Sequence, residues 1–252
     1  MEDVTISVAE GGDESFCLYR NIRTFGHRPL QTARQLELLK ESARAFSDIP
    51  LQMDAPQLEE CITSMLEEYG YPASMPSFVT VKWYPSGRLE IVGREVLPSP
   101  VLSLRKIYPR AAVAEWDIPF GCEWSSLSLA STAAALLRAQ QQDSRVRSII
   151  RCSSDGKVEA ADNAPLFMVV DDMVFAPATG APSAEFETAE QAIFAAGLTL
   201  QRRDITPDML ELADEVFYFD CRGITALAQC GNAHYMHLLA ERIGSRLGRM
   251  TL

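Results

Sequence analysis

Residues 205–227, ITPDMLELADEVFYFDCRGITAL, decide the fold that this chain is expected to adopt. Helical spacing begins at Pro207, a residue type that suits the first turn of a helix, and it ends near Ala213. Residues 216–219 are rich in β-branched and aromatic side chains and predict a strand. Gly223 follows, and glycine supplies the backbone freedom that a tight turn requires. The stretch therefore predicts a short helix, a strand and a glycine turn.

The residues outside this stretch predict a mixed α+β protein. The expected strands are 4–8, 16–23, 78–84, 88–92, 101–108, 111–116, 146–152, 157–159, 166–170, 173–176 and 198–203, and the expected helices are 31–46, 55–69, 127–142, 188–197 and 232–247. Gly11-Gly12-Asp13 predicts a hairpin of the first two strands, and Pro119-Phe120-Gly121 breaks the chain. We therefore predict domains at 1–118 and 119–252.

The composition is that of a globular protein, and its charge disfavours some classes of partner. The 252 residues are 47% hydrophobic, and the formal net charge of −11 argues against nucleic acid and against an anionic membrane surface. No apolar run is long enough to span a membrane, and the acidic start Met1-Glu2-Asp3 is unlike a secretory signal. We expect a cytoplasmic protein with six reduced cysteines.

No metal site is predicted, because neither the cysteines nor the three histidines have the spacing of metal ligands. His234 and His237 are three residues apart on the expected terminal helix. We interpret them as part of a partly exposed helix face.

Three segments of the second half resemble motifs of the fold-type-IV pyridoxal-phosphate enzymes, which include the class IV aminotransferases and aminodeoxychorismate lyases. Residues 155–159, DGKVE, resemble D-G-x-V-x-E, with Glu159 one position early. Residues 163–177, NAPLFMVVDDMVFAP, resemble S-N-[IL]-F-V-V-x-D-G-x-[LV]-x-T-P. Residues 213–225 are similar to A-D-E-[VL]-F followed by R-G-I-x-P-V, which is the most specific match. The first half is similar only in its order of hairpin, two helices and hairpin.

The resemblance implies a small N-terminal α/β sandwich and a larger, β-barrel-like C-terminal domain with helices. It also implies a homodimer and pyridoxal phosphate as cofactor. In that family the glutamate matched by Glu159 pairs with the pyridine nitrogen, and the turn matched by Arg222, Gly223, Ile224 and Thr225 presents backbone N–H groups to the phosphate. Two alternatives stay open: Glu159 can be a surface carboxylate, and Gly223 can serve the turn alone.

The catalytic lysine of these enzymes has no counterpart at the matching position. Their motif K-[ST]-L-N-[YL] matches only residues 125–129, SSLSL, in which Ser125 stands for the lysine. A serine hydroxyl cannot form an imine, and at neutral pH it is a poor base. Among the chain's lysines, Lys40 and Lys157 are expected in solvent, which leaves Lys82 or Lys106 to face the cleft.

Two further departures concern the cofactor phosphate. The family's H-x-x-R-L-x-x-S-A matches residues 35–43, QLELLKESA, in which Gln35 replaces the histidine and Leu38 the phosphate-binding arginine. The G-I-T-R segment is absent before the helix expected at 188, where Glu185 and Glu187 stand instead. A dianionic phosphate is unfavourable in a buried site without its arginine.

Three functions from different classes remain open. The first is a degenerate family member, a pseudoenzyme without transaminase or lyase activity that serves as a binding or scaffolding homodimer. The second is an active aminotransferase or aminodeoxychorismate lyase that uses Lys82 or Lys106. The third is non-covalent binding of a small amino-acid or keto-acid ligand, with Arg222 and Glu159 as its polar anchors.

Overall fold

A computed structural model describes residues 4–7, 16–114, 135–180 and 182–250 of the chain. These residues form two compact units, and the chain passes from the first to the second after Pro100. The domain boundary expected from the sequence was at residue 118. Within the described residues, no helix is both long enough and apolar enough to cross a membrane.

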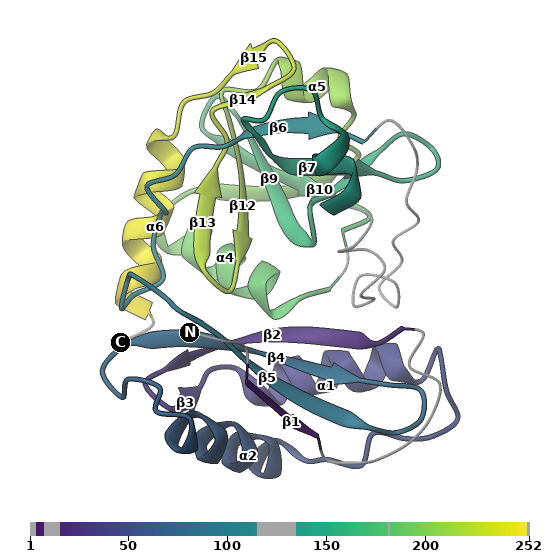
Figure 1. The fold of residues 1–252 in the computed structure, drawn as a ribbon. Helices are drawn as coiled ribbons and strands as arrows, with labels where there is room; N and C mark the ends of the chain where they lie inside the picture. Colours follow the sequence, from purple (N-terminus) through teal and green to yellow (C-terminus); the bar gives the residue numbers. More distant parts are fainter. Residues whose placement is uncertain (1–3, 8–15, 115–134, 181, 251–252) are drawn as a thin grey trace. The chain divides into compact units, whose positions relative to one another are not determined.

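The first unit is an antiparallel sheet packed against two helices (Figure 1). Its strand order is β1-β5-β4-β2-β3. The elements are β1 (Val4–Ser7), β2 (Leu18–Phe25), β3 (Arg28–Pro29), α1 (Thr32–Ala43), α2 (Ala55–Glu68), β4 (Pro76–Trp83) and β5 (Leu89–Val96). Alternate strand residues such as Val81 and Ile91 point to the helices and join Leu39 and Ile62 in one core.

Helix α2 begins where the sequence predicts it. The Asp54 carboxylate accepts a hydrogen bond from the Gln57 backbone N–H at 2.9 Å, and the Gln57 side chain accepts one from the Asp54 N–H at 3.0 Å. This reciprocal capping box satisfies two N–H groups that have no partner within the helix.

The expected hairpin of the first two strands is wrong. β1 pairs with β5, and β2 pairs with β3 and β4. Residues 8–15, where the turn was expected, lie outside the described residues. A strand pattern shows only that a segment is extended with one buried face. Whether β1 pairs with β2 or with β5 depends on long-range packing, which a local sequence pattern does not reveal.

The second unit is built on a larger, curled sheet, and ten strands belong to it within the described residues (Figure 1). Its main path is β11-β10-β9-β8-β7-β6-β14-β15, and β12 pairs with both β9 and β13. The strands are β6 (Arg110–Val113), β7 (Val146–Cys152), β8 (Val158–Ala161), β9 (Ala164–Val170), β10 (Met173–Pro177), β11 (Thr199–Arg203), β12 (Glu215–Asp220), β13 (Gly223–Ala226), β14 (Gln229–Cys230) and β15 (Ala233–His234).

The central strand β9 is buried on both faces, and the unit has two main cores. Along β9, Phe167 and Val169 point into a core with helices α4 (Ala184–Ala195) and α6 (Leu238–Met250). Leu166 and Met168 point into the other core, which also contains residues of the short helix α5 (Pro207–Glu211). The α+β fold, with a small antiparallel sheet and a larger curled one, confirms the predicted class.

Several predicted elements need correction. Residues 101–108 form no strand beyond a single bridge from Leu104 to Ile224. α4 begins at Ala184 instead of residue 188, because the Ser183 side chain caps it by accepting the Phe186 N–H at 2.9 Å. α6 begins at Leu238 instead of residue 232, so His234 and His237 do not share a helix. Of the helix expected at 127–142, residues 135–140 are described as helical.

Candidate functional site

The candidate cofactor turn is the tight connection between β12 and β13. Asp220 and Gly223 are opposite each other in the ladder, which leaves Cys221 and Arg222 at the turn. The Asp220 carboxylate accepts a hydrogen bond from the Arg222 backbone N–H at 2.8 Å, and its second oxygen lies 3.5 Å from the Arg222 guanidinium. One N–H of the turn and one guanidinium are therefore already bonded to a carboxylate within the turn.

Residues 103–105 engage the other side of the same turn. The Ile224 N–H donates to the Ser103 carbonyl oxygen at 3.0 Å, and the Arg105 N–H donates to the Ile224 carbonyl oxygen at 2.8 Å. Gly223 has φ +121°, and a Cβ built on it would lie 2.5 Å from the Ser103 oxygen. Only glycine fits here, because the neighbouring backbone fills the space that a side chain would need. This geometry favours the interpretation of Gly223 as structural.

Thr225 is also bonded within the chain. Its side chain is fully buried, and its hydroxyl oxygen accepts a hydrogen bond from the Arg105 guanidinium at 3.1 Å. The four predicted turn residues 222–225 thus lie together, but these hydrogen bonds connect them to Asp220, Ser103 and Arg105.

Glu159 is a buried acid on β8. Arg151 pairs with Ala160 and Cys152 pairs with Val158, so a bulge at Glu159 interrupts the ladder between β7 and β8. The side chain is only 8% exposed, and its Oε2 atom makes no hydrogen bond within the described residues. The interpretation of Glu159 as a surface carboxylate is therefore wrong.

Burial controls the protonation of Glu159. Desolvation raises the pKa of this carboxyl to about 7, and the nearby Asp155 carboxylate adds to the rise. The Arg151 guanidinium acts in the opposite direction. The site can thus hold a carboxyl group that gains or loses a proton near neutral pH.

Comparison with solved structures gives strong similarity in fold at low sequence identity. A branched-chain aminotransferase from Thermoproteus uzoniensis, solved with norvaline, matches 94% of this chain and 86% of its own, with TM-score 0.76 and 18% identity. An aminotransferase from Brucella abortus bound to PLP matches 91% and 87%, with TM-score 0.76 and 13% identity. The Escherichia coli branched-chain amino acid aminotransferase matches 91% and 83%, with TM-score 0.73 and 14% identity. The chain has the fold of the class IV aminotransferases.

At the level of sequence, no protein-family model and no curated protein matches this chain. The class IV aminotransferase fold is therefore recognised from the structure together with the three short motifs. Sequence identities of 13–18% show a common fold and no more.

The structure describes all four lysines of the chain, whereas Ser125 lies outside the described residues. Lys82 on β4 lies 3.6 Å from the Glu90 carboxylate. Lys157, in the connection between β7 and β8, lies 2.8 Å from Asp155 and 2.9 Å from Asp204. Lys106 is exposed to solvent.

The positions matched to the family's phosphate contacts lie on two helices. Leu38 is 2% exposed on α1, where it is one of the residues that the helix buries. Glu185 and Glu187 lie in the first turn of α4. Carboxylates at a helix N-terminus interact favourably with the exposed N–H groups of the first turn. A phosphate would bind to the same N–H groups.

Among the described residues, those matched to the phosphate end of pyridoxal phosphate do not fit a phosphate. The N–H groups of Arg222 and Ile224 donate to Asp220 and Ser103, and the first turn of α4 carries two acids. The buried Oε2 atom of Glu159 is an acceptor that suits the pyridine end of the cofactor. Sequence reasoning missed Asp220 and Ser103. Asp220 was detectable, since an aspartate two residues before a turn N–H is a common Asx turn.

Proposed function

We propose that this protein keeps the class IV aminotransferase fold without transaminase or lyase activity, and that it does not use pyridoxal phosphate. The observation that carries the proposal is Ser125 in the register of the Schiff-base lysine. An imine needs a primary amine on the protein, and the same amine acts as the base that moves the substrate proton. A hydroxyl group supplies neither function.

The phosphate end supports the same proposal. The hydrogen bond from the Arg222 N–H to Asp220, at 2.8 Å, would have to break before a phosphate could take its place. Two anions competing for one group of donors repel each other, so Asp220 disfavours a phosphate there. By the same resemblance, we propose a cytoplasmic homodimer.

A second candidate is non-covalent binding of a small amino-acid or keto-acid ligand. The buried Oε2 atom of Glu159 favours it, because an unused acceptor inside a protein is costly unless it has a partner in some functional state. The ammonium group of an amino acid would satisfy this oxygen, whereas a keto acid has no donor for it. The active-enzyme alternative has less support, because the Lys82 ammonium lies beside the Glu90 carboxylate.

The test is cofactor binding by the purified full-length chain. It is mixed with pyridoxal phosphate, its absorbance spectrum is recorded, and the sample is reduced with borohydride and mapped by peptide mass spectrometry. An active class IV aminotransferase serves as positive control. We expect no imine band and no labelled lysine. A yellow protein with specific labelling at Lys82 or Lys106 would contradict the proposal and support an active enzyme.

The variant Ser125→Lys separates the loss of the amine from the loss of the phosphate site. We expect it to become labelled at residue 125 only at high pyridoxal phosphate concentration, because the donors for the phosphate are still bonded to Asp220 and Ser103. Free pyridoxal, which has no phosphate, should label it about equally well. Tight binding of pyridoxal phosphate by this variant would show that the phosphate site is intact and that only the lysine is missing.

A further inference from the structure

The first unit contains a pocket of about 290 Å³ beside the end of helix α1. The residues that line it all lie between positions 40 and 51. The last turn of α1 provides one wall, and the segment that follows this helix provides the other. The pocket is large enough for a small organic molecule of roughly ten non-hydrogen atoms.

Contacts with the turn between β4 and β5 hold the second wall in place. The Ser47 hydroxyl donates to the Pro85 carbonyl oxygen at 3.2 Å, and its oxygen accepts a hydrogen bond from the Ile49 backbone N–H at 3.1 Å. A Cβ built on Gly87 would lie 3.1 Å from a methyl carbon of Ile49, so this side chain packs against the turn. The pocket is therefore formed before a ligand binds, as small-molecule sites usually are.

Two cations on one side of α1 line the pocket. Lys40 and Arg44 are four residues apart, and Arg44 has φ −61° and ψ −23°, so the helical geometry extends to it. Residues at this spacing are neighbours on a helix surface, with Cβ atoms roughly 5–6 Å apart. Because both side chains are long and flexible, one anion in the pocket can contact both of them.

Neither cation has a partner among the described residues. Lys40 and Arg44 make no ion pair and no side-chain hydrogen bond in that part of the chain. The end of α1 does not require them as hydrogen-bond donors either. The carbonyl oxygens of Lys40, Ser42 and Ala43 already accept backbone N–H groups of residues 44–47. The two positive charges are therefore available to a ligand.

The remaining lining limits the charge of that ligand. Asp48 also lines the pocket, at an exposed position, so two cations and one carboxylate leave a single excess positive charge. Ala43 is buried and Leu51 is half-buried, and both are apolar. A monoanion with an apolar part matches this lining, whereas a second negative charge would be repelled by Asp48.

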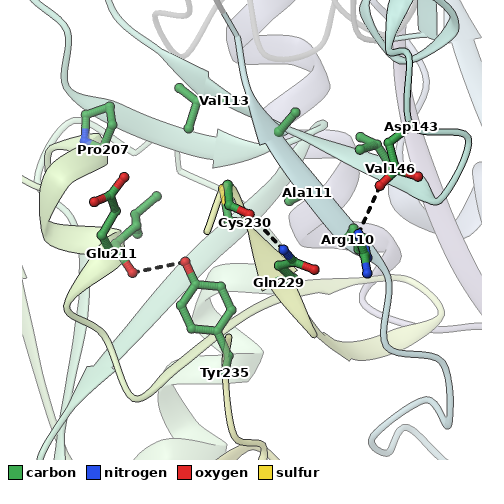
Figure 2. A pocket seen from close by; sticks show the side chains of 13 residues that line it. Arg110, Ala111, Val113, Asp143, Val146, Pro207, Glu211, Gln229, Cys230 and Tyr235 are labelled. Carbon is green, nitrogen blue, oxygen red and sulfur yellow. Dashed lines mark hydrogen bonds and ion pairs between the residues drawn. The ribbon is translucent and has the colours of Figure 1, made fainter. Parts of the chain in front are cut away.

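A larger pocket, of about 360 Å³ in the second unit, offers no comparable cation among its described residues (Figure 2). The Arg110 guanidinium donates to the Asp143 carboxylate at 3.0 Å, and Asp143 also accepts a hydrogen bond from Arg145 at 2.9 Å. Glu211, which also lines this pocket, is an acid. The second pocket is therefore a control within the same protein, because an anion should not bind there.

We propose that the pocket beside α1 binds a small monocarboxylate with an apolar body. The carboxylate accepts hydrogen bonds from the Lys40 ammonium and the Arg44 guanidinium, and its two oxygens allow it to accept from both donors at once. The apolar body lies against Ala43 and Leu51. The site uses none of the residues of the function proposed above, so each proposal can fail without the other.

The test is an NMR titration of the full-length, isotope-labelled protein with phenylacetate. We expect saturable shifts of the Ala43 and Leu51 amide signals, with a Kd of about 1 mM or tighter for a ligand of this size. The Cys230 amide signal, from the larger pocket, should not move. The matched alcohol, 2-phenylethanol, should bind about tenfold more weakly, and 2-phenylethylamine should not bind. Equal affinity for the three probes, or no saturable shift with phenylacetate, would overturn the proposal.

Three variants connect binding to the proposed contacts. Lys40→Gln and Arg44→Gln each remove one cation and should weaken phenylacetate binding about tenfold, as expected for one lost charge-assisted hydrogen bond. Asp48→Asn removes the repelling carboxylate and should strengthen binding about threefold. Lys106→Gln, at an exposed position outside the pocket, is the matched control and should leave the Kd unchanged. Arg44 is exposed, so unchanged affinity in Arg44→Gln would contradict the site even if Lys40→Gln failed to fold.

Discussion

At the scale of single residues, Glu159 combines a buried position with a raised pKa. It is a carboxyl in a mostly apolar part of the sheet, and its pKa of about 7 lies above the 4.5 expected in the unfolded chain. The folded state therefore holds its proton more tightly than the unfolded state does between these pH values. The contribution of Glu159 to stability is most favourable below pH 4.5 and is lost as the pH rises through 7.

We predict that Glu159→Gln stabilises the protein at pH 8 and has a much smaller effect at pH 5. Glutamine stays neutral, so the cost of a buried charge disappears, and the difference between variant and wild type should grow by about 2–3 kcal/mol over this range. Urea unfolding at both pH values measures it. Glu60→Gln, which removes an exposed carboxyl on α2, is the control. Parallel pH curves for wild type and Glu159→Gln would contradict the prediction.

Residue chemistry shows how far the sequence could predict the candidate site. The turn and its glycine were predictable, because a positive φ restricts the choice of residue almost to glycine. The contacts of that turn with Ser103 and Arg105 were not, since more than a hundred residues separate the partners. The burial of Glu159 was left open by the sequence, because a bulge changes where a strand residue points.

At the scale of elements, the β12–β13 hairpin depends on a glycine that touches another segment. Gly223→Ala should destabilise the protein by at least about 2 kcal/mol, because the new methyl group would lie 2.5 Å from the Ser103 carbonyl oxygen at φ +121°. Gly156→Ala is the matched control. Gly156 also has a positive φ, +75°, but no atom lies within 4 Å of the position that a Cβ would take there, so it should cost only about 1 kcal/mol. Chemical denaturation measures the free energy of unfolding of both variants. Equal losses in Gly223→Ala and Gly156→Ala would show that backbone strain, and not the contact with Ser103, causes the destabilisation.

The elements that were predicted correctly are those with local signals. The capping box of α2 and the turn between β9 and β10, where Asp171 has φ +54°, depend on residues a few positions apart. The strand expected at 101–108 has no such signal. Residues 101–108 have the apolar pattern of a strand, but they contact β13 mainly through the bridge from Leu104 to Ile224. The partner of β1 likewise depends on the sheet as a whole.

At the scale of the whole molecule, each hydrophobic core lies within one of the two units. Among the described residues, the core that contains Leu58, Ile62 and Trp83 consists of residues before Pro100. The described residues in the cores of the second unit all follow Pro100. A segment that buries its own core and satisfies its own sheet meets the main requirements for folding independently.

We therefore predict that residues 1–100 fold when expressed alone. This fragment contains Trp83 as its single tryptophan, because Trp116 and Trp124 lie beyond its end. Trp83 is fully buried, so its fluorescence should be blue-shifted in buffer and should move to longer wavelength in one cooperative urea transition.

Leu58→Ala, which truncates another fully buried side chain, should lower the free energy of unfolding by about 2–5 kcal/mol. Glu59→Ala, at an exposed neighbouring position of α2, should change it by less than about 0.5 kcal/mol. If residues 1–100 gave the same tryptophan emission spectrum in buffer as in urea, the fragment would be unfolded in buffer. That result would show that the first unit needs the rest of the chain to fold.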